Sequence, residues 1–213
     1  ATVGRYPDGR GSALVLVRAW SDRQPSVYLV FDPASGKLTG LGNSRPTIKA
    51  EAMAQRDLRR IGARDGLPLP VHVTRPAGVK GPAPTVVLVH GGPYERGGEW
   101  EWDADSQFLA SRGYAVIEPE FRGSTGFGTR HFRAGWKQWG LAMQDDLADG
   151  AKWLVAQGFA DPKRLGIYGA SYGGYASLQA MVKTPDLFKC AIAGLAVTDL
   201  VYQNTSLDTD YVS

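Results

Sequence analysis

The chain has 213 residues, of which 43% are hydrophobic and 21% are charged, so it is too rich in apolar residues to be disordered. Its single cysteine, Cys190, excludes a small fold held by internal disulfides. The net charge of +3 comes from 24 basic and 21 acidic residues that are interspersed along the chain. No apolar stretch approaches the roughly 18 residues that span a bilayer. We therefore expect no nucleic acid and no membrane among its partners.

The sequence begins with residues 1–4 (ATVG), without an initiator methionine or a signal segment. We interpret this start as an internal cut in a longer protein, so a missing targeting signal carries no information. The location in the cell stays unknown, with the cytoplasm slightly favoured.

The first 45 residues indicate a small antiparallel β-structure. Residues 13–20 and 27–32 are rich in Val and Leu, and a Pro/Gly turn then leads into residues 38–41. This pattern predicts a meander of about three strands. Three strands bury too little apolar surface to be stable alone, so we expect residues 1–45 to be the remnant of a larger β-structure.

After residue 46 the pattern predicts an α/β fold. Residues 63–66 form a turn, and Pro68, Pro70 and Pro76 exclude a helix around them. Strands are predicted at residues 85–89, 114–117, 165–168 and 190–197, and helices at residues 105–112, 141–157 and 174–183. Strands separated by helices of this length indicate a doubly wound, mostly parallel sheet.

Residues 169–173 (GASYG) carry a G-x-S-x-G motif between a predicted strand and a predicted helix. This is the setting of a nucleophile elbow, in which a tight turn exposes the serine at the carboxyl end of the sheet. Side chains at Gly169 or Gly173 would collide with the strand and the helix. A turn that merely joins strand to helix is the alternative, and a dinucleotide loop fails because it needs glycine where Ser171 stands. We predict that Ser171 is the catalytic nucleophile.

Residues 90–93 (HGGP) follow the first parallel strand. A tetrahedral intermediate needs two N–H donors, one from the residue after the nucleophile and one from such a glycine-rich loop. We predict that the N–H groups of Gly92 and Tyr172 form this oxyanion hole. His90 ends a strand and is too constrained to be a mobile base, so we interpret it as a structural histidine.

Four motifs in chain order support a family resemblance. They are residues 90–93 (HGGP), 118–128 (EPEFRGSTGFG), 145–146 (DD) and 169–175 (GASYGGY). Over about residues 50–205 the chain resembles the α/β-hydrolase catalytic domain of the prolyl oligopeptidase family of serine peptidases, in its acylaminoacyl-peptidase and dipeptidyl-peptidase-like branches. In that family a β-propeller precedes the hydrolase domain. The resemblance implies that residues 1–45 are a propeller remnant and residues 46–213 the N-terminal portion of the catalytic domain.

We interpret one arginine and four tryptophans outside these motif roles as structural residues. We expect Arg122 to form an ion pair with Asp145 and Asp146 at a helix start. Four tryptophans are expected mainly in the core, with a substrate pocket as the less favoured alternative; they are Trp100, Trp102, Trp136 and Trp139.

No general base follows the predicted nucleophile. An α/β-hydrolase triad runs Ser, Asp or Glu, then His along the chain, whereas the three histidines all precede Ser171; they are His72, His90 and His131. Three acidic residues after the serine come too early to be the triad acid, namely Asp199, Asp208 and Asp210. The resemblance places both missing groups beyond Ser213, so we expect this chain alone to be inactive.

These observations predict a serine hydrolase that cleaves short peptides or acyl-peptides through a Ser171 acyl-enzyme. A carboxylesterase with the same elbow and a truncated, non-catalytic binding protein are the alternatives. We expect a peptide or ester substrate, no cofactor and no metal, and the substrate specificity stays open. Residues 190–197 carry neither charge nor proline, so an exposed edge strand there predicts self-association.

Overall fold

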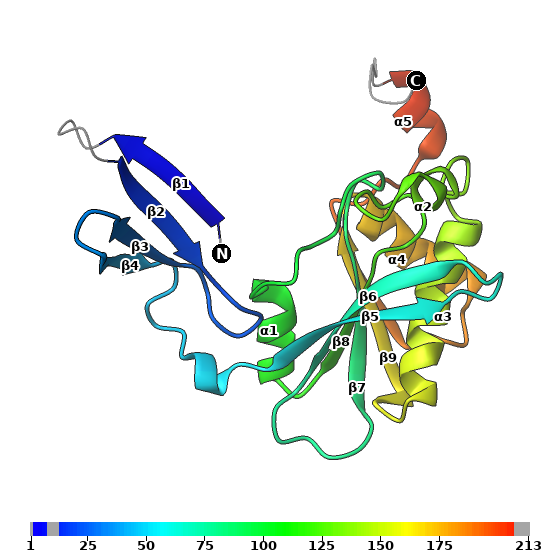
Figure 1. The fold of residues 1–213 in the computed structure, drawn as a ribbon. Coiled ribbons are helices and arrows are strands. Elements are labelled where there is room, and N and C mark those ends of the chain that lie inside the picture. Colours follow the sequence, from blue (N-terminus) through cyan, green and yellow to red (C-terminus); the bar gives the residue numbers. More distant parts are fainter. Residues whose placement is uncertain (1, 8–12, 207–213) are drawn as a thin grey trace.

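A computed structural model describes residues 2–7 and 13–206, which form two β-sheets (Figure 1). The first sheet has four antiparallel strands in chain order, which are β1 (Thr2–Pro7), β2 (Ala13–Ala19), β3 (Val27–Asp32) and β4 (Lys37–Asn43). The expected antiparallel sheet is therefore present, with one strand more than the approximately three predicted. Strand β1 pairs with β2 along its length, although its sequence contains Gly4 and Pro7 and lacks the run of Val and Leu that marks β2.

The second sheet has six strands in the order β10-β9-β7-β8-β6-β5. Its strands are β5 (Gln55–Gly62), β6 (Pro68–Arg75), β7 (Ala83–Val89), β8 (Ala115–Pro119), β9 (Ala160–Ala170) and β10 (Cys190–Gly194). The helices are α1 (Ala104–Ser111), α2 (Thr129–Arg133), α3 (Ala142–Ala156), α4 (Tyr172–Lys183) and α5 (Leu200–Ser206), with a 3₁₀ turn, η1 (Ala50–Ala52). Within the described ranges, no helix is both long and apolar enough to cross a bilayer.

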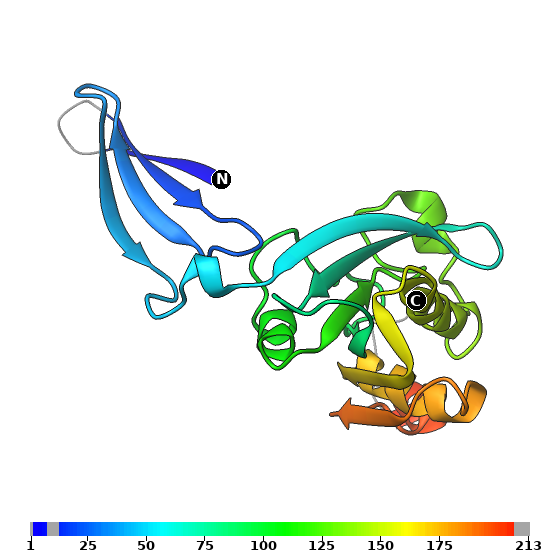
Figure 2. The ribbon, with the colours of Figure 1, turned by 90° about the horizontal axis from the view of Figure 1, so that it is seen from below.

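The second sheet is mostly parallel and has helices on both faces. Strands β8, β7, β9 and β10 run parallel, whereas β5 and β6 form an antiparallel hairpin at one edge. Helix α1 packs on β6 and β8, and α3 and α4 pack against β7 and β9 on the other face (Figures 1 and 2). The predicted doubly wound α/β-hydrolase sheet is confirmed.

The core lies between this sheet and helices α3 and α4. Val87, Ile117 and Ile167 come from three adjacent strands and pack in one cluster with Leu147 and Leu154 of α3. Each is at most 1% exposed, and burying such a side chain contributes about 1.5–3 kcal/mol. This packing holds the carboxyl ends of β7 and β9 side by side.

The last strand is shorter than expected. β10 ends at Gly194 rather than at residue 197, because Leu195 adopts φ +46°, a left-handed conformation that a strand cannot continue through. Within the described part of the chain β10 pairs only with β9, so it is an edge strand.

The β2–β3 connection ties the first sheet to the second. Asp22 accepts a hydrogen bond from the Arg56 N–H at 3.0 Å, and the Asp22 carbonyl accepts one from the Gln107 amide. Arg56 is 1% exposed and donates to both carboxylate oxygens of Glu118 on β8. The division at residue 45 remains a prediction.

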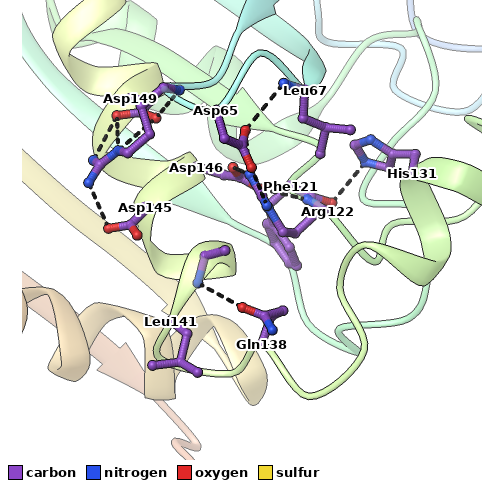
Figure 3. A network of polar contacts seen from close by, with 12 residues as sticks. Asp65, Leu67, Phe121, Arg122, His131, Gln138, Leu141, Asp145, Asp146 and Asp149 are labelled. Atoms are coloured by element: carbon purple, nitrogen blue, oxygen red, sulfur yellow. Dashed lines mark hydrogen bonds and ion pairs between the residues drawn. The ribbon is translucent and has the colours of Figure 1, made fainter.

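A buried ion pair anchors the loop after β8 to α3. Arg122 donates to both carboxylate oxygens of Asp146, at 2.8 and 2.9 Å, and also to Asp65 in the β5–β6 turn (Figure 3). The expected pair with Asp146 is confirmed. Asp145 instead pairs with Arg64 and Lys183, because it lies on the outer side of α3 where those two cations reach it.

The members of this network differ in burial. The Asp146 side chain is fully buried, whereas Asp65 is half-exposed. The hydrogen bonds from Arg122 lower the pKa of Asp65 to about 2. Because that pKa is depressed in the folded chain, its contribution to stability is present at neutral pH and is lost as the pH falls below about 4 towards 2.

Removing Asp146 tests the structural role of the pair. Asp146→Ala leaves the Arg122 cation buried beside only one, half-exposed carboxylate, and breaking a buried pair costs about 3–5 kcal/mol. Arg64→Ala removes the two exposed ion pairs that this residue of the β5–β6 turn makes with Asp145 and Asp149 on α3, and exposed pairs contribute only about 0–1 kcal/mol each. Urea unfolding of both variants measures the difference, and equal losses would contradict the assignment.

Candidate active site

Ser171 occupies a sharp turn between β9 and α4. Its backbone adopts φ 57° and ψ −119°, a conformation that non-glycine residues rarely adopt, and its side chain is exposed. Strain of this kind costs about 1–3 kcal/mol and is concentrated at functional sites. The Ser171 N–H donates to the Gly194 carbonyl at 2.9 Å, which ties the turn to β10. The predicted strand, turn and helix around the serine are confirmed.

Two glycines allow this turn to lie directly on the end of β7. A Cβ added to Gly169 would lie 2.5 Å from the Val89 carbonyl oxygen, and a Cβ on Gly173 would overlap the same oxygen. Side chains at both positions would therefore collide, as expected. The obstacle is the last residue of the neighbouring strand β7.

The glycine-rich loop after β7 lies beside the serine. A Cβ added to Gly91 would be 3.6 Å from the Ser171 Cβ, and Gly92 is exposed with φ +110°. Tyr172 is the first residue of α4, so its N–H has no acceptor within the helix. The structure thus brings the loop that carries Gly92 next to Ser171 and Tyr172.

The His90 ring is held at both nitrogens and on its face. Its Nδ1 lies 2.6 Å from the Gly91 carbonyl oxygen and its Nε2 lies 2.9 Å from Ser124 Oγ. The ring stacks on Phe121, with centroids 4.3 Å apart and planes inclined by 12°. Burial lowers the pKa of His90 to about 4, so the imidazole is neutral at pH 7. These contacts fix the ring, as expected of a structural histidine.

Glu120 stabilises the loop between β7 and α1. Its carboxylate accepts hydrogen bonds from the Gly97 and Gly98 N–H groups, both at 3.0 Å, and it is 2% exposed. Burial raises the pKa of Glu120, although the two backbone donors oppose that shift. Gly97 is packed against His90 so closely that any side chain there would overlap the imidazole ring.

Tyr172 is the centre of an aromatic cluster. Its ring is fully buried and lies 4.7 Å from Trp139 and 5.2 Å from Phe121 between centroids. This burial raises the pKa of the Tyr172 hydroxyl above its usual range, so it stays protonated. Trp139 is therefore a packing residue. Trp100 and Trp102 donate their indole N–H groups to the Arg56 carbonyl and the Met53 sulfur. Trp100 and Trp136 are 46% and 50% exposed, so the expected core position is wrong for these two.

The described residues provide no general base for Ser171. No hydrogen bond joins it to a histidine within residues 13–206, and the His131 Nε2 instead contacts the Phe121 carbonyl. Asp199 accepts a hydrogen bond from the Tyr202 N–H at the start of α5, whereas Asp208 and Asp210 lie outside the described residues. No cluster of metal-binding side chains occurs in the described ranges.

Comparison with known proteins identifies the family. A profile of the prolyl oligopeptidase family matches residues 100–213, which is more than half of the chain. The chain belongs to the prolyl oligopeptidase family. The matched residues include Ser171 and the loop after β8.

Relatives agree with this membership and are much longer. Dipeptidyl aminopeptidase BIII of Pseudoxanthomonas mexicana is 38% identical over 193 residues, a match that covers 87% of this chain and 27% of the relative. A puromycin-hydrolyzing peptidase of Mycobacterium tuberculosis superposes with a TM-score of 0.77 at 31% identity, covering 88% of this chain and 29% of that one. The acylaminoacyl peptidase of Pyrococcus horikoshii superposes with a TM-score of 0.72 at 27% identity, covering 91% and 30%.

Several residues that support the site escaped sequence reasoning. Phe121 and Ser124 contact His90 from a segment that is distant in the sequence, and Gly97 packs on it from the same loop after β7. Within residues 118–128 the sequence predicts a role for Arg122 alone. The glycines of this motif are the one signal in the sequence for these contacts. They indicate that backbone segments pack closely there, but they do not indicate which segment is the neighbour.

Gly173→Ala tests the close approach of the elbow to β7. The added methyl group overlaps the Val89 carbonyl, and we expect a loss of stability of about 1–3 kcal/mol or more because the backbone must shift. Gly62→Ala on β5 is the matched control, since a Cβ there meets nothing within 4 Å. Denaturant unfolding measures both, and a neutral Gly173→Ala would contradict the packing.

Proposed function

We propose that this chain is part of a serine peptidase that cleaves peptides or acyl-peptides through an acyl-enzyme on Ser171. The observation that carries the proposal is the exposed, strained serine at the start of α4 with a glycine-rich loop against it. The α4 N-terminus favours the negative charge that develops there. The peptidase names of the relatives support this substrate class over a simple ester.

We also propose that the Gly92 and Tyr172 N–H groups stabilise the oxyanion. Tyr172 supplies a helix-terminal N–H next to the nucleophile, and Gly92 supplies one from the loop beside it. Losing one such donor typically costs about 2.7–4 kcal/mol of transition-state stabilisation. These residues act on the carbonyl oxygen after Ser171 has attacked the carbonyl carbon.

We propose that the base and the acid of the triad lie in the part of the protein that follows Ser213. The three histidines of this chain precede Ser171, and the relatives are several times longer than the part that matches. Residues 1–45 are, in this proposal, the last part of a β-propeller, and residues 46–213 are the first part of the hydrolase domain. The 213-residue chain alone would then be catalytically inactive, since its serine stays neutral.

Covalent labelling tests the nucleophile. The full-length protein that contains this chain should react with a fluorophosphonate at Ser171, and peptide mapping should find the adduct there. Ser171→Ala should lower kcat by several powers of ten, as triad removal does in other serine hydrolases. An adduct on another serine, or full activity of Ser171→Ala, would refute the proposal.

We further propose that the isolated 213-residue chain self-associates through its edge strand. Exposed apolar side chains gather on α4, β10 and the segment after it, with Val182 76% exposed, Ile192 61% and Leu195 92%. An uncharged edge strand beside such a surface is prone to pair with a second copy.

Light scattering at micromolar concentration should therefore show dimers or larger species. Ile192→Lys places a charge on the edge strand and should shift the chain towards monomer, whereas Val79→Lys, at an exposed apolar position in the loop between β6 and β7, should not. A stable monomer of the unmodified chain would refute this part of the proposal.

A further inference from the structure

We infer that Glu95 is a specificity-determining residue, whose carboxylate binds a positively charged group of the substrate beside the scissile bond. That group is an ammonium or a guanidinium, carried by the amino terminus or by a Lys or Arg side chain within about two residues of the bond. The inference rests on the proposed function, in which Ser171 attacks the carbonyl carbon and Gly92 donates to the oxyanion.

Glu95 lies in the loop between β7 and α1, directly against the glycine that carries a proposed oxyanion donor. A Cβ added to Gly92 would be 3.4 Å from the Glu95 Cβ and 3.3 Å from the Glu95 nitrogen. The preceding residue, Gly91, lies beside Ser171, with 3.6 Å between an added Cβ and the Ser171 Cβ. Gly92 and Glu95 are both exposed. An extended peptide advances about 3.3–3.6 Å per residue, so groups one or two residues from the attacked carbonyl come within reach of this carboxylate.

Contacts on two sides fix the backbone that carries Glu95. Its carbonyl oxygen accepts a hydrogen bond from the Thr125 N–H at 3.2 Å. The neighbouring Tyr94 ring packs on Gly123, where an added Cβ would be 3.4 Å from it, and makes an edge contact with Phe132 at 5.8 Å between centroids. The carboxylate is thus presented from an ordered loop, which reduces the entropy that is lost when a ligand binds.

The Glu95 carboxylate is not neutralised by the rest of the loop. Within residues 13–206 no cation pairs with it and no N–H or O–H donates to it. The next residue, Arg96, is engaged elsewhere, because it pairs with Glu99 at 3.0 Å and donates to the Gly98 carbonyl at 3.1 Å. The Arg96 guanidinium also lies over the Phe127 ring. The negative charge of Glu95 is therefore available to a ligand.

A free carboxylate at this place opposes the proposed reaction unless a cation offsets it. Attack by Ser171 creates a negative charge on the carbonyl oxygen, and like charges repel more strongly where a bound substrate excludes water. The Glu95 charge is felt at the site: burial lowers the pKa of His90 to about 4, and the Gly91 carbonyl and the Glu95 charge oppose that shift. A substrate cation paired with Glu95 would form an ion pair and remove the repulsion.

Matched substrates measure this preference in the full-length protein and locate the cation. Alanyl-alanine p-nitroanilide with a free and with an acetylated amino terminus tests the terminal ammonium. Lysyl-alanine and norleucyl-alanine p-nitroanilides test a side chain on the acyl side, since p-nitroaniline is the whole leaving group. Quenched fluorescent peptides with lysine or norleucine directly after the scissile bond test the leaving-group side. We expect kcat/KM to favour the cationic member about three- to fivefold in the arm whose cation reaches Glu95, as for an exposed ion pair.

Glu95→Gln keeps the shape of the side chain and should reduce that ratio to less than about twofold, whereas Glu95→Lys should invert it. Raising the salt concentration from about 0.05 to 0.5 M should lower the ratio of the unmodified enzyme, because salt screens exposed charges. Glu51→Gln is the matched control, since Glu51 is an exposed glutamate of η1. It lines a cavity with Ala83 and Ala115, the first residues of β7 and β8, so it lies at the opposite end of the sheet from Ser171. This variant should keep the ratio of the unmodified enzyme.

The outcomes separate this inference from the proposed function. Equal ratios in the unmodified and Glu95→Gln enzymes in every arm, or no preference for a cation in any arm, would overturn the role of Glu95 while Ser171 was still labelled by a fluorophosphonate. An equal loss of preference in Glu51→Gln would also overturn it. An unmodified enzyme that is not labelled at Ser171 would refute the proposed function instead.

Discussion

The structure depends on the contact between the nucleophile turn and the end of β7. Gly169 and Gly173 approach the Val89 carbonyl so closely that neither position has room for a Cβ. This close approach fixes the position of the strained Ser171. It also places the serine beside the glycine-rich loop, because that loop begins at His90, directly after Val89. The parallel pairing of β7 with β9 places the two strand ends together. The candidate active site is a consequence of that pairing.

A buried ion pair and a buried aromatic ring stabilise the loops around this contact. The Arg122–Asp146 pair fastens the loop after β8 to α3, and the neighbouring Phe121 lies between the rings of His90 and Tyr172. A charged anchor and an aromatic contact thus come from consecutive residues of one motif. The motif stabilises the site without reaching the nucleophile.

Much of the fold could be predicted from the sequence because it depends on local periodicity. The apolar run over residues 85–89 and the amphipathic pattern over residues 141–157 correspond to β7 and α3. The strand, turn and helix around Ser171 were equally visible, since a G-x-S-x-G motif in that setting has a steric reason. Strand β1 and the five-residue helix α2 were missed because they are short and carry no regular apolar spacing.

The contacts that the sequence could not reveal are tertiary. The packing of Gly97 on His90 and the pairing of Asp145 with Arg64 each depend on a neighbour that the local sequence pattern does not name. The oxyanion roles of Gly92 and Tyr172 remain predictions, although the structure brings their segments together.

The most direct measurement of the central claim is a crystal structure of the full-length protein with a phosphonate covalently bound to the nucleophile. The account predicts an adduct on Ser171 whose oxygen lies about 3 Å from both the Gly92 and the Tyr172 nitrogen atoms. An adduct on another serine, or N–H groups of Gly92 and Tyr172 that point away from its oxygen, would contradict the account.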